Sequence, residues 1–342
     1  MSVQVGVIGT GMIGADHIRR LSGAPARAVV VAVADADPDR AHRQAAQAPG
    51  ARAYGSGQEL IASADVDAVL VASPGSTHEE YVLASIAAGK PVFCEKPLAT
   101  TQAACERIMA AEMSGGRRLV QVGYMRRYDP AYRALKSVID EGRIGAPTLI
   151  HAAHRNPAVP VNYTSDMAII DTAVHDIDVT RWLLGEEIAA ARVLTPRRNG
   201  HVAGQLPDPI LLLLETQSGV LADVEVSVNI GYGYDIRGEV VGERGTAELG
   251  DTSPVVVRAD GQRRGKVPAD WRERFGDAYD LELAEWISSV AAGEAAGPSA
   301  WDGYAVSVVS DAAVAAATSG ERVAVSVPKR PAFYATGLPS RT

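Results

Sequence analysis

The feature that most constrains this chain is a glycine-rich turn near its N-terminus. The apolar run Val3–Ile8 predicts a buried strand, and Met12–Leu21 has the pattern of a helix. Between them, Gly9, Gly11 and Gly14 have the spacing G-x-G-x-x-G. In a strand–turn–helix unit the first glycine permits a tight turn, the second lets a pyrophosphate approach the backbone, and the third lets the helix pack on the strand. The sequence therefore predicts a dinucleotide-binding turn.

An acidic residue at the end of the next strand indicates which dinucleotide is bound. Asp35 follows Gly14 by about 20 residues, and a carboxylate there accepts hydrogen bonds from both ribose hydroxyls of NAD. The backbone of Met12 and Ile13, in the first helical turn, is expected to present free N–H groups to the pyrophosphate. The alternative is a glycine turn that binds nothing, but strand, glycines and acid in one register favour NAD.

The alternation of strands and helices ends near Val122, and 342 residues exceed one typical core. We expect residues 1–122 to form an α/β Rossmann domain with a parallel sheet, and residues 123–342 an α+β domain with a largely antiparallel open sheet. The first domain's expected strands are Val3–Ile8, Ala28–Ala34, Val66–Ala72, Pro91–Cys94 and Leu119–Val122, and its helices are Met12–Leu21, Pro38–Ala48, Thr77–Ala88 and Thr101–Glu112. The second domain's expected strands are Thr148–Ala153, Ala191–Leu194, Ile210–Glu215, Val220–Val228, Arg237–Val241, Thr246–Leu249 and Val255–Arg258, and its helices are Asp129–Asp140, Asp171–Leu184, Asp280–Val290 and Gly303–Ala317.

Charge and composition argue against some classes of partner and indicate the compartment. A net charge of −8 argues against nucleic acid or an anionic membrane as the main partner. The N-terminus has no basic region before an apolar one, and no run reaches the roughly 18 apolar residues of a membrane helix. The two cysteines, Cys94 and Cys105, form no Cys-x-x-Cys and suggest a reducing cytoplasm.

Polar residues follow the third and fourth strands, where an open parallel sheet binds its ligands. Ser73 and His78 are placed near the cofactor, although His78 is equally a helix-start histidine without a ligand. Glu95 and Lys96 fall where the nicotinamide would lie, and Lys96-Pro97 is compatible with a defined turn that includes a cis bond. Lys96 would present its charge to a substrate oxygen; the alternative is an ordinary surface lysine.

A later helix carries the candidate base. Asp171 and His175 are four residues apart and are predicted to share one face of the helix Asp171–Leu184. An Asp that holds a His fixes its tautomer and raises its basicity. A capping Asp with a satisfied core His is the alternative reading, and from the residues alone it stays open.

We expect no metal site. His175, Asp176 and Asp178 do not share one helical face. His151 and His154 would point to opposite faces of a strand, and no cysteine assists them.

Together these motifs resemble the glucose–fructose oxidoreductase/inositol dehydrogenase/MocA family over nearly the full chain. The family-level marks are the glycine loop, the Glu95-Lys96-Pro97 sequence and Asp171-x-x-x-His175. More specific runs are Gly123–Asp129, His154–Pro157, Asn162–Ala168, Tyr232–Arg237 and Glu239–Glu243. One departure is His175-Asp176, where relatives often carry His-Glu; the acid is kept. Residues 197–208 match no pattern and are expected to form a loop.

The resemblance implies NAD-dependent oxidation of a secondary hydroxyl of a cyclic polyol, foremost myo-inositol to 2-keto-myo-inositol. It implies that His175 takes the hydroxyl proton, that Asp171 orients it, and that Lys96 polarises the reacting oxygen. It places Arg126, His154, Asn156 and Tyr234 near the polyol, and implies a homotetramer built through the open sheet faces. Alternatives are a related cyclitol, an aminocyclitol or a sugar as substrate, or a non-catalytic NAD-binding regulator. Retention of Lys96, Asp171 and His175 argues against the regulator.

Overall fold

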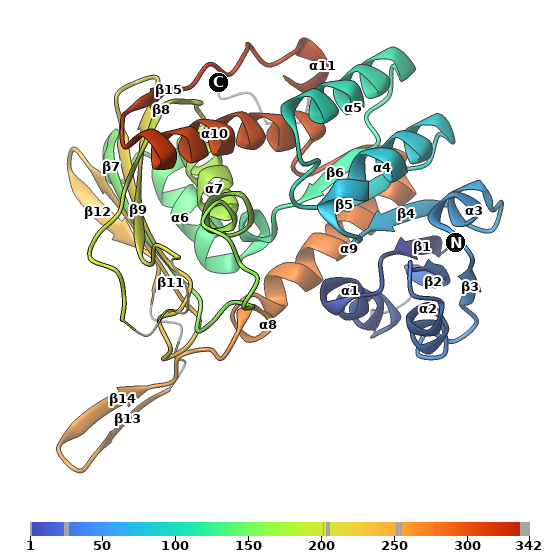
Figure 1. The fold of residues 1–342 in the computed structure, drawn as a ribbon, viewed down its shortest axis with the longest axis horizontal. Coiled ribbons are helices and arrows are strands. Elements are labelled where there is room, and N and C mark those ends of the chain that lie inside the picture. Colours follow the sequence, from blue (N-terminus) through green and yellow to red (C-terminus); the bar gives the residue numbers. More distant parts are fainter. Residues whose placement is uncertain are drawn as a thin grey trace. The chain divides into compact units, whose positions relative to one another are not determined.

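A computed structural model describes residues 2–23, 27–200, 202, 206–250, 253 and 255–335. The chain divides into two compact units (Figure 1). The first holds residues 1–124, 280–304 and 329–342, and the second holds residues 125–279 and 305–328. The sequence predicts a single boundary after residue 122. That position is close to the first crossing, but the prediction does not anticipate that residues 280–304 return to the first unit.

The first unit contains the predicted parallel sheet, in the order β3-β2-β1-β4-β5-β6. Every neighbouring pair runs parallel, which confirms the Rossmann class. Its strands are β1 (Val3–Ile8), β2 (Ala28–Ala34), β3 (Arg52–Tyr54), β4 (Ala68–Val71), β5 (Val92–Glu95) and β6 (Val120–Gly123). Its helices are α1 (Met12–Gly23), α2 (Pro38–Ala45), α3 (Gly57–Ala62), η1 (Gly75–Thr77), α4 (His78–Ala87), α5 (Gln102–Gly115) and α11 (Ala332–Ala335). Helices α9 (Gly276–Ala292) and α10 (Ala300–Ser319) contribute residues to both units.

Packing explains why part of α9 belongs to the first unit. Leu283, Trp286 and Ile287 are buried in the same apolar cluster as the strand residues of this unit. Their spacing is that of one apolar helix face. The Trp286 ring lies 5.5 Å, centroid to centroid, from the Phe93 ring of β5. The sequence predicts a helix over Asp280–Val290 but does not indicate which sheet it packs against.

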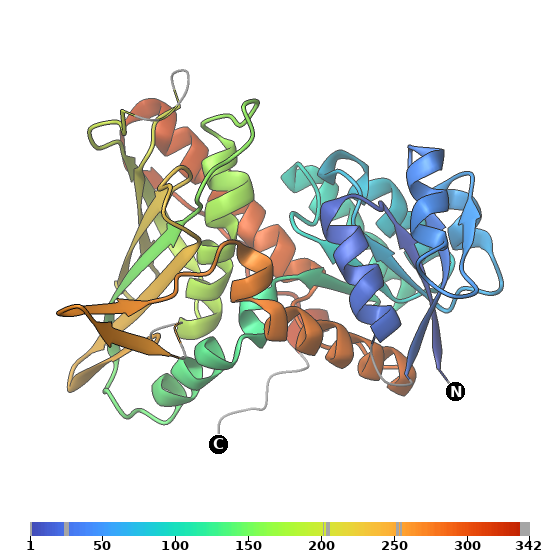
Figure 2. The same ribbon diagram turned by 90° about the horizontal axis from the view of Figure 1, so that it is seen from below.

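The second unit is built on a sheet of order β12-β11-β7-β10-β9-β8-β15 (Figure 2). Strands β7 and β10 run parallel, and the other neighbours run antiparallel, which confirms the predicted class. Its strands are β7 (Pro147–Arg155), β8 (Ile188–Leu194), β9 (Ile210–Thr216), β10 (Leu221–Ser227), β11 (Asp235–Gly242), β12 (Gly245–Glu248) and β15 (Val323–Ala324). A separate two-stranded sheet consists of β13 (Val256–Ala259) and β14 (Gln262–Gly265), and the helices are η2 (Met125–Tyr128), α6 (Pro130–Asp140), η3 (Ala168–Ala173), α7 (Val174–Leu184) and α8 (Trp271–Arg274).

Only one face of this sheet forms the core of the second unit. Along β9, Leu212 and Leu214 are buried, whereas Leu211 and Leu213 are half-buried. Within the described residues, no helix lies over the side of the sheet that faces away from α6 and α7 (Figures 1 and 2). Side chains of the apolar run at 210–214 therefore point alternately to the core face and to the open face of the sheet.

The structure corrects one local expectation. The predicted helix Asp171–Leu184 is an α-helix only from Val174, because η3 is a π-helix over Ala168–Ala173. Such a one-turn widening inside a helix is rare and often lies at a functional site. Most of the predicted loop 197–208 has no regular structure, and residues 201 and 203–205 lie outside the described part of the chain. Among the described helices, none combines the length and apolarity required to cross a bilayer.

Candidate active site

The three glycines of the first turn differ in what surrounds them. Gly9 has φ +88°, and a Cβ there would lie 2.3 Å from the Ser73 backbone nitrogen. A Cβ on Gly14 would lie 1.9 Å from the Gly9 carbonyl oxygen. Neither position tolerates a side chain. At Gly11 nothing lies closer than the Arg40 Nη1, at 4.0 Å, so this side of the turn is open to a ligand. The arrangement fits a pyrophosphate cradle at the start of α1.

Asp35, at the end of β2, is held rigidly against this turn. Its Oδ2 accepts hydrogen bonds from the Thr10 N–H at 2.7 Å and the Thr10 hydroxyl at 2.9 Å, and its Oδ1 accepts from the Asp37 N–H at 2.9 Å. Burial opposes ionisation, but the amides of Asp37 and Thr10 outweigh it and hold the pKa of Asp35 below its usual value. Arg40 Nη1 lies 3.7 Å from Oδ1. Asp35 therefore carries a fixed negative charge.

The loop after β4 touches the same turn but does not expose its histidine. Ser73 hydrogen-bonds Thr77 between hydroxyls at 2.7 Å. His78 is buried, with Nδ1 2.7 Å from the Pro97 carbonyl and Nε2 2.8 Å from the Ser73 carbonyl. Burial lowers the pKa of His78, and a neutral ring donates to one of these carbonyls. Of the two alternatives for His78, this geometry favours a structural link between the loops after β4 and β5.

Glu95 is a buried anchor for the backbone of Lys96. Its Oε1 lies 2.7 Å from Nε2 of His17 on α1, and its Oε2 accepts the Lys96 N–H at 3.2 Å. Both acid and histidine are buried, and the His17 ring also meets Phe93 edge-on. The Lys96–Pro97 peptide bond is cis, as the sequence reading allowed. The structure thus assigns Glu95 a positioning contact, and it adds His17, which sequence reasoning missed.

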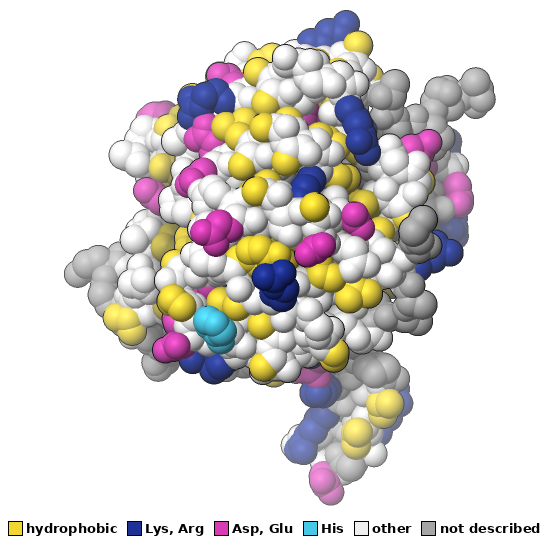
Figure 3. All heavy atoms as spheres, turned by 90° about the vertical axis from the view of Figure 1, so that its right-hand side faces the viewer, with side chains coloured by type: hydrophobic (Ala, Val, Ile, Leu, Met, Phe, Trp, Pro, Cys, Tyr) yellow, Lys and Arg dark blue, Asp and Glu magenta, His cyan; other side chains and the backbone are white. Residues whose placement is uncertain are grey.

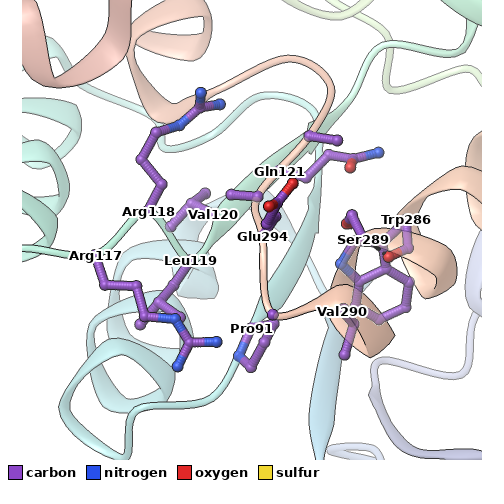
Figure 4. A pocket seen from close by; sticks show the side chains of 13 residues that line it. Pro91, Arg117, Arg118, Leu119, Val120, Gln121, Trp286, Ser289, Val290 and Glu294 are labelled. Atoms are coloured by element: carbon purple, nitrogen blue, oxygen red, sulfur yellow. Dashed lines mark hydrogen bonds between the residues drawn. The ribbon is translucent and has the colours of Figure 1, made fainter. Parts of the chain in front are cut away.

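A hollow in the first unit is not this site. It is lined by residues that include Pro91, Leu119, Trp286 and Glu294 (Figure 4). Pro91 and Leu119 precede β5 and β6, so the hollow lies at the amino ends of these strands. Parallel sheets bind ligands beyond the carboxyl ends, and the predicted cofactor residues lie there.

In the second unit, the helix that carries the candidate base is buried along most of its length. His175 is 8% exposed, and Asp171 is half-buried in the π-helical turn before it. The Tyr163 hydroxyl lies 3.5 Å from an Asp171 carboxylate oxygen and 2.6 Å from the Thr172 hydroxyl. Asn156 reaches the same turn, with Nδ2 3.5 Å from the Thr172 Oγ1. The structure thus brings Asn156 to Thr172, the residue after Asp171, with Tyr163 as a neighbour of both Asp171 and Thr172.

Asp176 organises the polar residues beside His175. One of its oxygens accepts a hydrogen bond from Arg126, and the other lies 2.8 Å from the His154 Nδ1. Arg126 Nη2 also lies 2.9 Å from that nitrogen. One nitrogen cannot both accept a proton from Arg126 and donate one to Asp176. With Nδ1–H donated to the Asp176 carboxylate, the Arg126 contact is not a hydrogen bond to His154, and Arg126 is held by Asp176 instead. Nε2 of His154 then faces the Tyr234 hydroxyl at 3.4 Å.

This network changes the role predicted for Arg126. Its side chain is 1% exposed and bonded to Asp176, so the structure does not present it to a ligand. His154, His175 and Tyr234 do come together: the rings of the two histidines lie 6.3 Å apart and those of His154 and Tyr234 lie 5.8 Å apart. Sequence reasoning weighed Asp176 as a metal ligand and as a retained acid, but did not pair it with Arg126 or His154. No group of three or more His, Cys, Asp or Glu in the described residues is arranged to hold a metal ion.

Replacing Asp176 with asparagine is expected to destabilise the second unit by about 3 kcal/mol near neutral pH, because it leaves the buried Arg126 charge uncompensated. Burial opposes ionisation of Asp176, but Arg126 and His154 hold its pKa below the ordinary value. A carboxylate with a depressed folded pKa stabilises above its unfolded pKa, about 4, and loses this contribution as the pH falls through its folded value.

Denaturant unfolding across pH measures this effect. The Asn variant should have a lower free energy of unfolding than the parent near neutral pH. As the pH falls, this free energy should decrease less in the variant than in the parent, because the variant has no carboxylate at position 176 to protonate. The double variant Asp176→Leu with Arg126→Met should recover much of the loss. An Asn variant as stable as the parent would refute the importance of this pair.

Comparison with known proteins agrees with both units. Residues 3–124 match the family model described as "Oxidoreductase family, NAD-binding Rossmann fold", and residues 136–325 match "Oxidoreductase family, C-terminal alpha/beta domain". The chain belongs to the glucose–fructose oxidoreductase/inositol dehydrogenase/MocA family of oxidoreductases. The family resemblance, the Rossmann fold and the NAD cofactor are thereby confirmed.

Individual relatives narrow the class. The chain is 53% identical over 336 residues to the inositol 2-dehydrogenase of Acidiphilium cryptum, covering 98% of this chain and 100% of the relative. It is 54% identical to inositol 2-dehydrogenase 3 of Saccharopolyspora erythraea, covering 98% of each. Among solved structures, myo-inositol dehydrogenase from Lactobacillus casei in complex with NAD(H) and myo-inositol matches with a TM-score of 0.95 and 40% identity, covering 98% and 100%.

Proposed function

We propose that this protein is an NAD-dependent inositol 2-dehydrogenase that oxidises myo-inositol to 2-keto-myo-inositol. The observation that carries the proposal is the 53–54% identity to inositol 2-dehydrogenases over 98% of the chain. The similarity to a structure holding NAD(H) and myo-inositol supports the same pair of ligands. Gly11 leaves space for the pyrophosphate, and the fixed charge of Asp35 suits the ribose of NAD.

We assign the chemistry to His175, Asp171 and Lys96. His175 is the base that takes the hydroxyl proton, and Asp171 orients it and shares its charge. Lys96 stabilises negative charge on the reacting oxygen, and Glu95 with His17 positions the Lys96 backbone. When bound, NAD supplies the acceptor for the hydride that leaves the alcohol carbon.

We assign polyol recognition to the cluster around His154. Each buried hydroxyl left without a partner costs about 1–3 kcal/mol, so a polyol site needs many hydrogen-bonding groups. Asn156, Tyr234 and His154 supply donors and acceptors. Asp176 acts through His154, whose Nδ1 it holds, and Arg126 acts through Asp176.

The biological setting is also part of the proposal. We propose that the enzyme works in the cytoplasm, in inositol catabolism, as a homotetramer formed through the open faces of the second-unit sheets. Half-buried Leu211 and Leu213 and exposed Leu221 on the open face support such an interface. Both cysteines are buried and neither forms a disulfide, as suits a reducing compartment.

A substrate panel tests the proposed activity. Purified protein with NAD should form NADH with myo-inositol at a higher kcat/KM than with scyllo-inositol, chiro-inositol, glucose or an aminocyclitol. Robust NADH formation with another cyclitol and none with myo-inositol would overturn the substrate while keeping the enzyme class. Binding of NAD without turnover of any polyol would favour the non-catalytic regulator.

A further inference from the structure

Asp171 lies in the π-helical turn η3, directly before α7. Within this turn the Val174 N–H bonds the Ile169 carbonyl, five residues earlier. A π-helical turn thus pairs each residue with the fifth one along, whereas an α-helix pairs it with the fourth. The wider turn changes the angular position of Asp171 relative to His175 from that in a continuous α-helix, where residues four apart share a face. Contacts that hold this turn therefore set the direction of Asp171.

The Tyr163 side chain contacts this turn at both ends. Its hydroxyl lies 2.7 Å from the carbonyl oxygen of Met167, which directly precedes η3, and 2.6 Å from the Thr172 hydroxyl near the end of η3. The structure describes all of residues 161–166, and among them Tyr163 alone is half-buried while the others are exposed. An exposed segment therefore directs one aromatic side chain inward, onto the turn that carries Asp171.

The donors and acceptors of these contacts can be assigned. A carbonyl oxygen only accepts, so the single proton of the Tyr163 hydroxyl is donated to Met167, and Thr172 donates its own proton to the Tyr163 oxygen. Burial and the negative charge of Asp171 raise the pKa of Tyr163, so its hydroxyl keeps this proton at neutral pH. The Asp171 carboxylate is 3.5 Å from the hydroxyl, at the limit of a hydrogen bond. The strong contacts of Tyr163 are therefore to the residues on either side of Asp171.

We propose that Tyr163 is a positioning residue for the dehydrogenase reaction: its hydroxyl holds η3 between Met167 and Thr172, and so fixes the direction from which Asp171 orients His175. The inference rests on the proposed function, in which Asp171 orients the base. An α-helical turn in place of η3 would move Thr172 relative to Met167 and would weaken both hydrogen bonds. The two bonds thus favour the wide turn over the ordinary helix.

The variant Tyr163→Phe removes both hydrogen bonds and keeps the ring. It should lower kcat with myo-inositol about tenfold, because small displacements of an orienting group slow the chemical step. It should leave KM within about threefold, because it removes no contact to the polyol. Asp171→Asn should lower kcat about 10²-fold. The double variant should be within about twofold of Asp171→Asn, because Tyr163 acts through Asp171. Losses that add would show a general structural effect and overturn the proposal.

Thr172 offers a matched pair of variants. Thr172→Ser keeps the hydroxyl that donates to Tyr163 and should keep kcat within about threefold of the parent. Thr172→Val removes this hydroxyl and should lower kcat at least as much as Tyr163→Phe, since Asn156 Nδ2 also lies 3.5 Å from it. The control Tyr304→Phe removes a hydroxyl 3.2 Å from Glu106 and should leave kcat unchanged. A Val variant as active as the Ser variant would contradict the proposed contact.

Amide hydrogen exchange tests the same contact without substrate. In folded Tyr163→Phe, the amides of residues 167–174 should exchange about fivefold faster or more, because the turn opens locally more often. The β13–β14 hairpin is an internal reference. It projects from the second unit with basic and hydrophobic side chains at its surface (Figures 1 and 3), and all four β14 residues are exposed. Its exchange should be the same in the parent and the variant.

The outcomes separate this inference from the proposed function. Unchanged exchange in the η3 turn, or a large loss of kcat for Asp171→Asn with none for Tyr163→Phe, would overturn the role of Tyr163 and leave the proposed function intact. Full activity of Asp171→Asn would overturn both, because Tyr163 would then have no orienting carboxylate to position.

Discussion

Replacing His175 with alanine is expected to lower kcat by about 10²-fold or more, and Lys96→Ala should have an effect of the same order. Loss of a general base, or of a charge that stabilises a developing oxyanion, costs this much in many enzymes. Steady-state NADH formation with myo-inositol measures both effects. NAD affinity should change little, since neither change removes the glycine turn or Asp35.

Two controls distinguish a loss of catalysis from a general loss of structure. His42→Ala removes an exposed histidine of α2 and should leave kcat unchanged. Thermal unfolding should show that the His175 and Lys96 variants remain folded. If both folded variants kept near-normal turnover, the assignment of Lys96, Asp171 and His175 as the catalytic unit would be wrong.

Asp35 should make the parent enzyme prefer NAD over NADP by roughly 30- to 1,000-fold in kcat/KM. The 2′-phosphate of NADP removes a hydrogen bond to this carboxylate and adds like-charge repulsion, together about 2–4 kcal/mol. Because Thr10 and Asp37 hold the carboxylate on both oxygens, it cannot swing away from the phosphate without losing these bonds.

The double change Asp35→Ser with Ala36→Arg should move the ratio toward NADP, since it removes the repulsion and adds a cation. It should also lower kcat/KM with NAD, because Asp35 supports Thr10. Arg40 is the cation nearest to Asp35, with its guanidinium 3.7 Å from the carboxylate. Because this charge would attract the 2′-phosphate of NADP, Arg40→Ala should reduce NADP use and raise the preference for NAD. A parent that used both cofactors equally would show that Asp35 does not face the ribose.

Local patterns predicted most of the fold. Strands β1 and β2 have the predicted bounds, Val3–Ile8 and Ala28–Ala34, because their apolar runs are long and end at turn residues. Short elements such as β3 (Arg52–Tyr54) were missed, since three residues carry no periodicity. The return of α9 to the first unit depends on contacts with Phe93, which lies far away in sequence.

The residues of the candidate site also differ in whether local sequence or tertiary packing determines their arrangement. The glycine spacing and Asp35 are local sequence features, so the sequence alone predicts the cofactor-binding turn. The π-helical turn at Ala168–Ala173 and the pairing of Asp176 with Arg126 depend on tertiary packing. The family resemblance implied Arg126 as a contact of the polyol, whereas the structure buries its side chain against Asp176.

The most direct test of the central claim is the fate of the hydrogen on the oxidised carbon. With myo-inositol deuterated at C2, mass spectrometry of the reduced cofactor should find deuterium in NADH. NMR of the product should show the ketone at C2. Reduced cofactor without deuterium, or a ketone at another carbon, would contradict the assignment of this protein as an inositol 2-dehydrogenase.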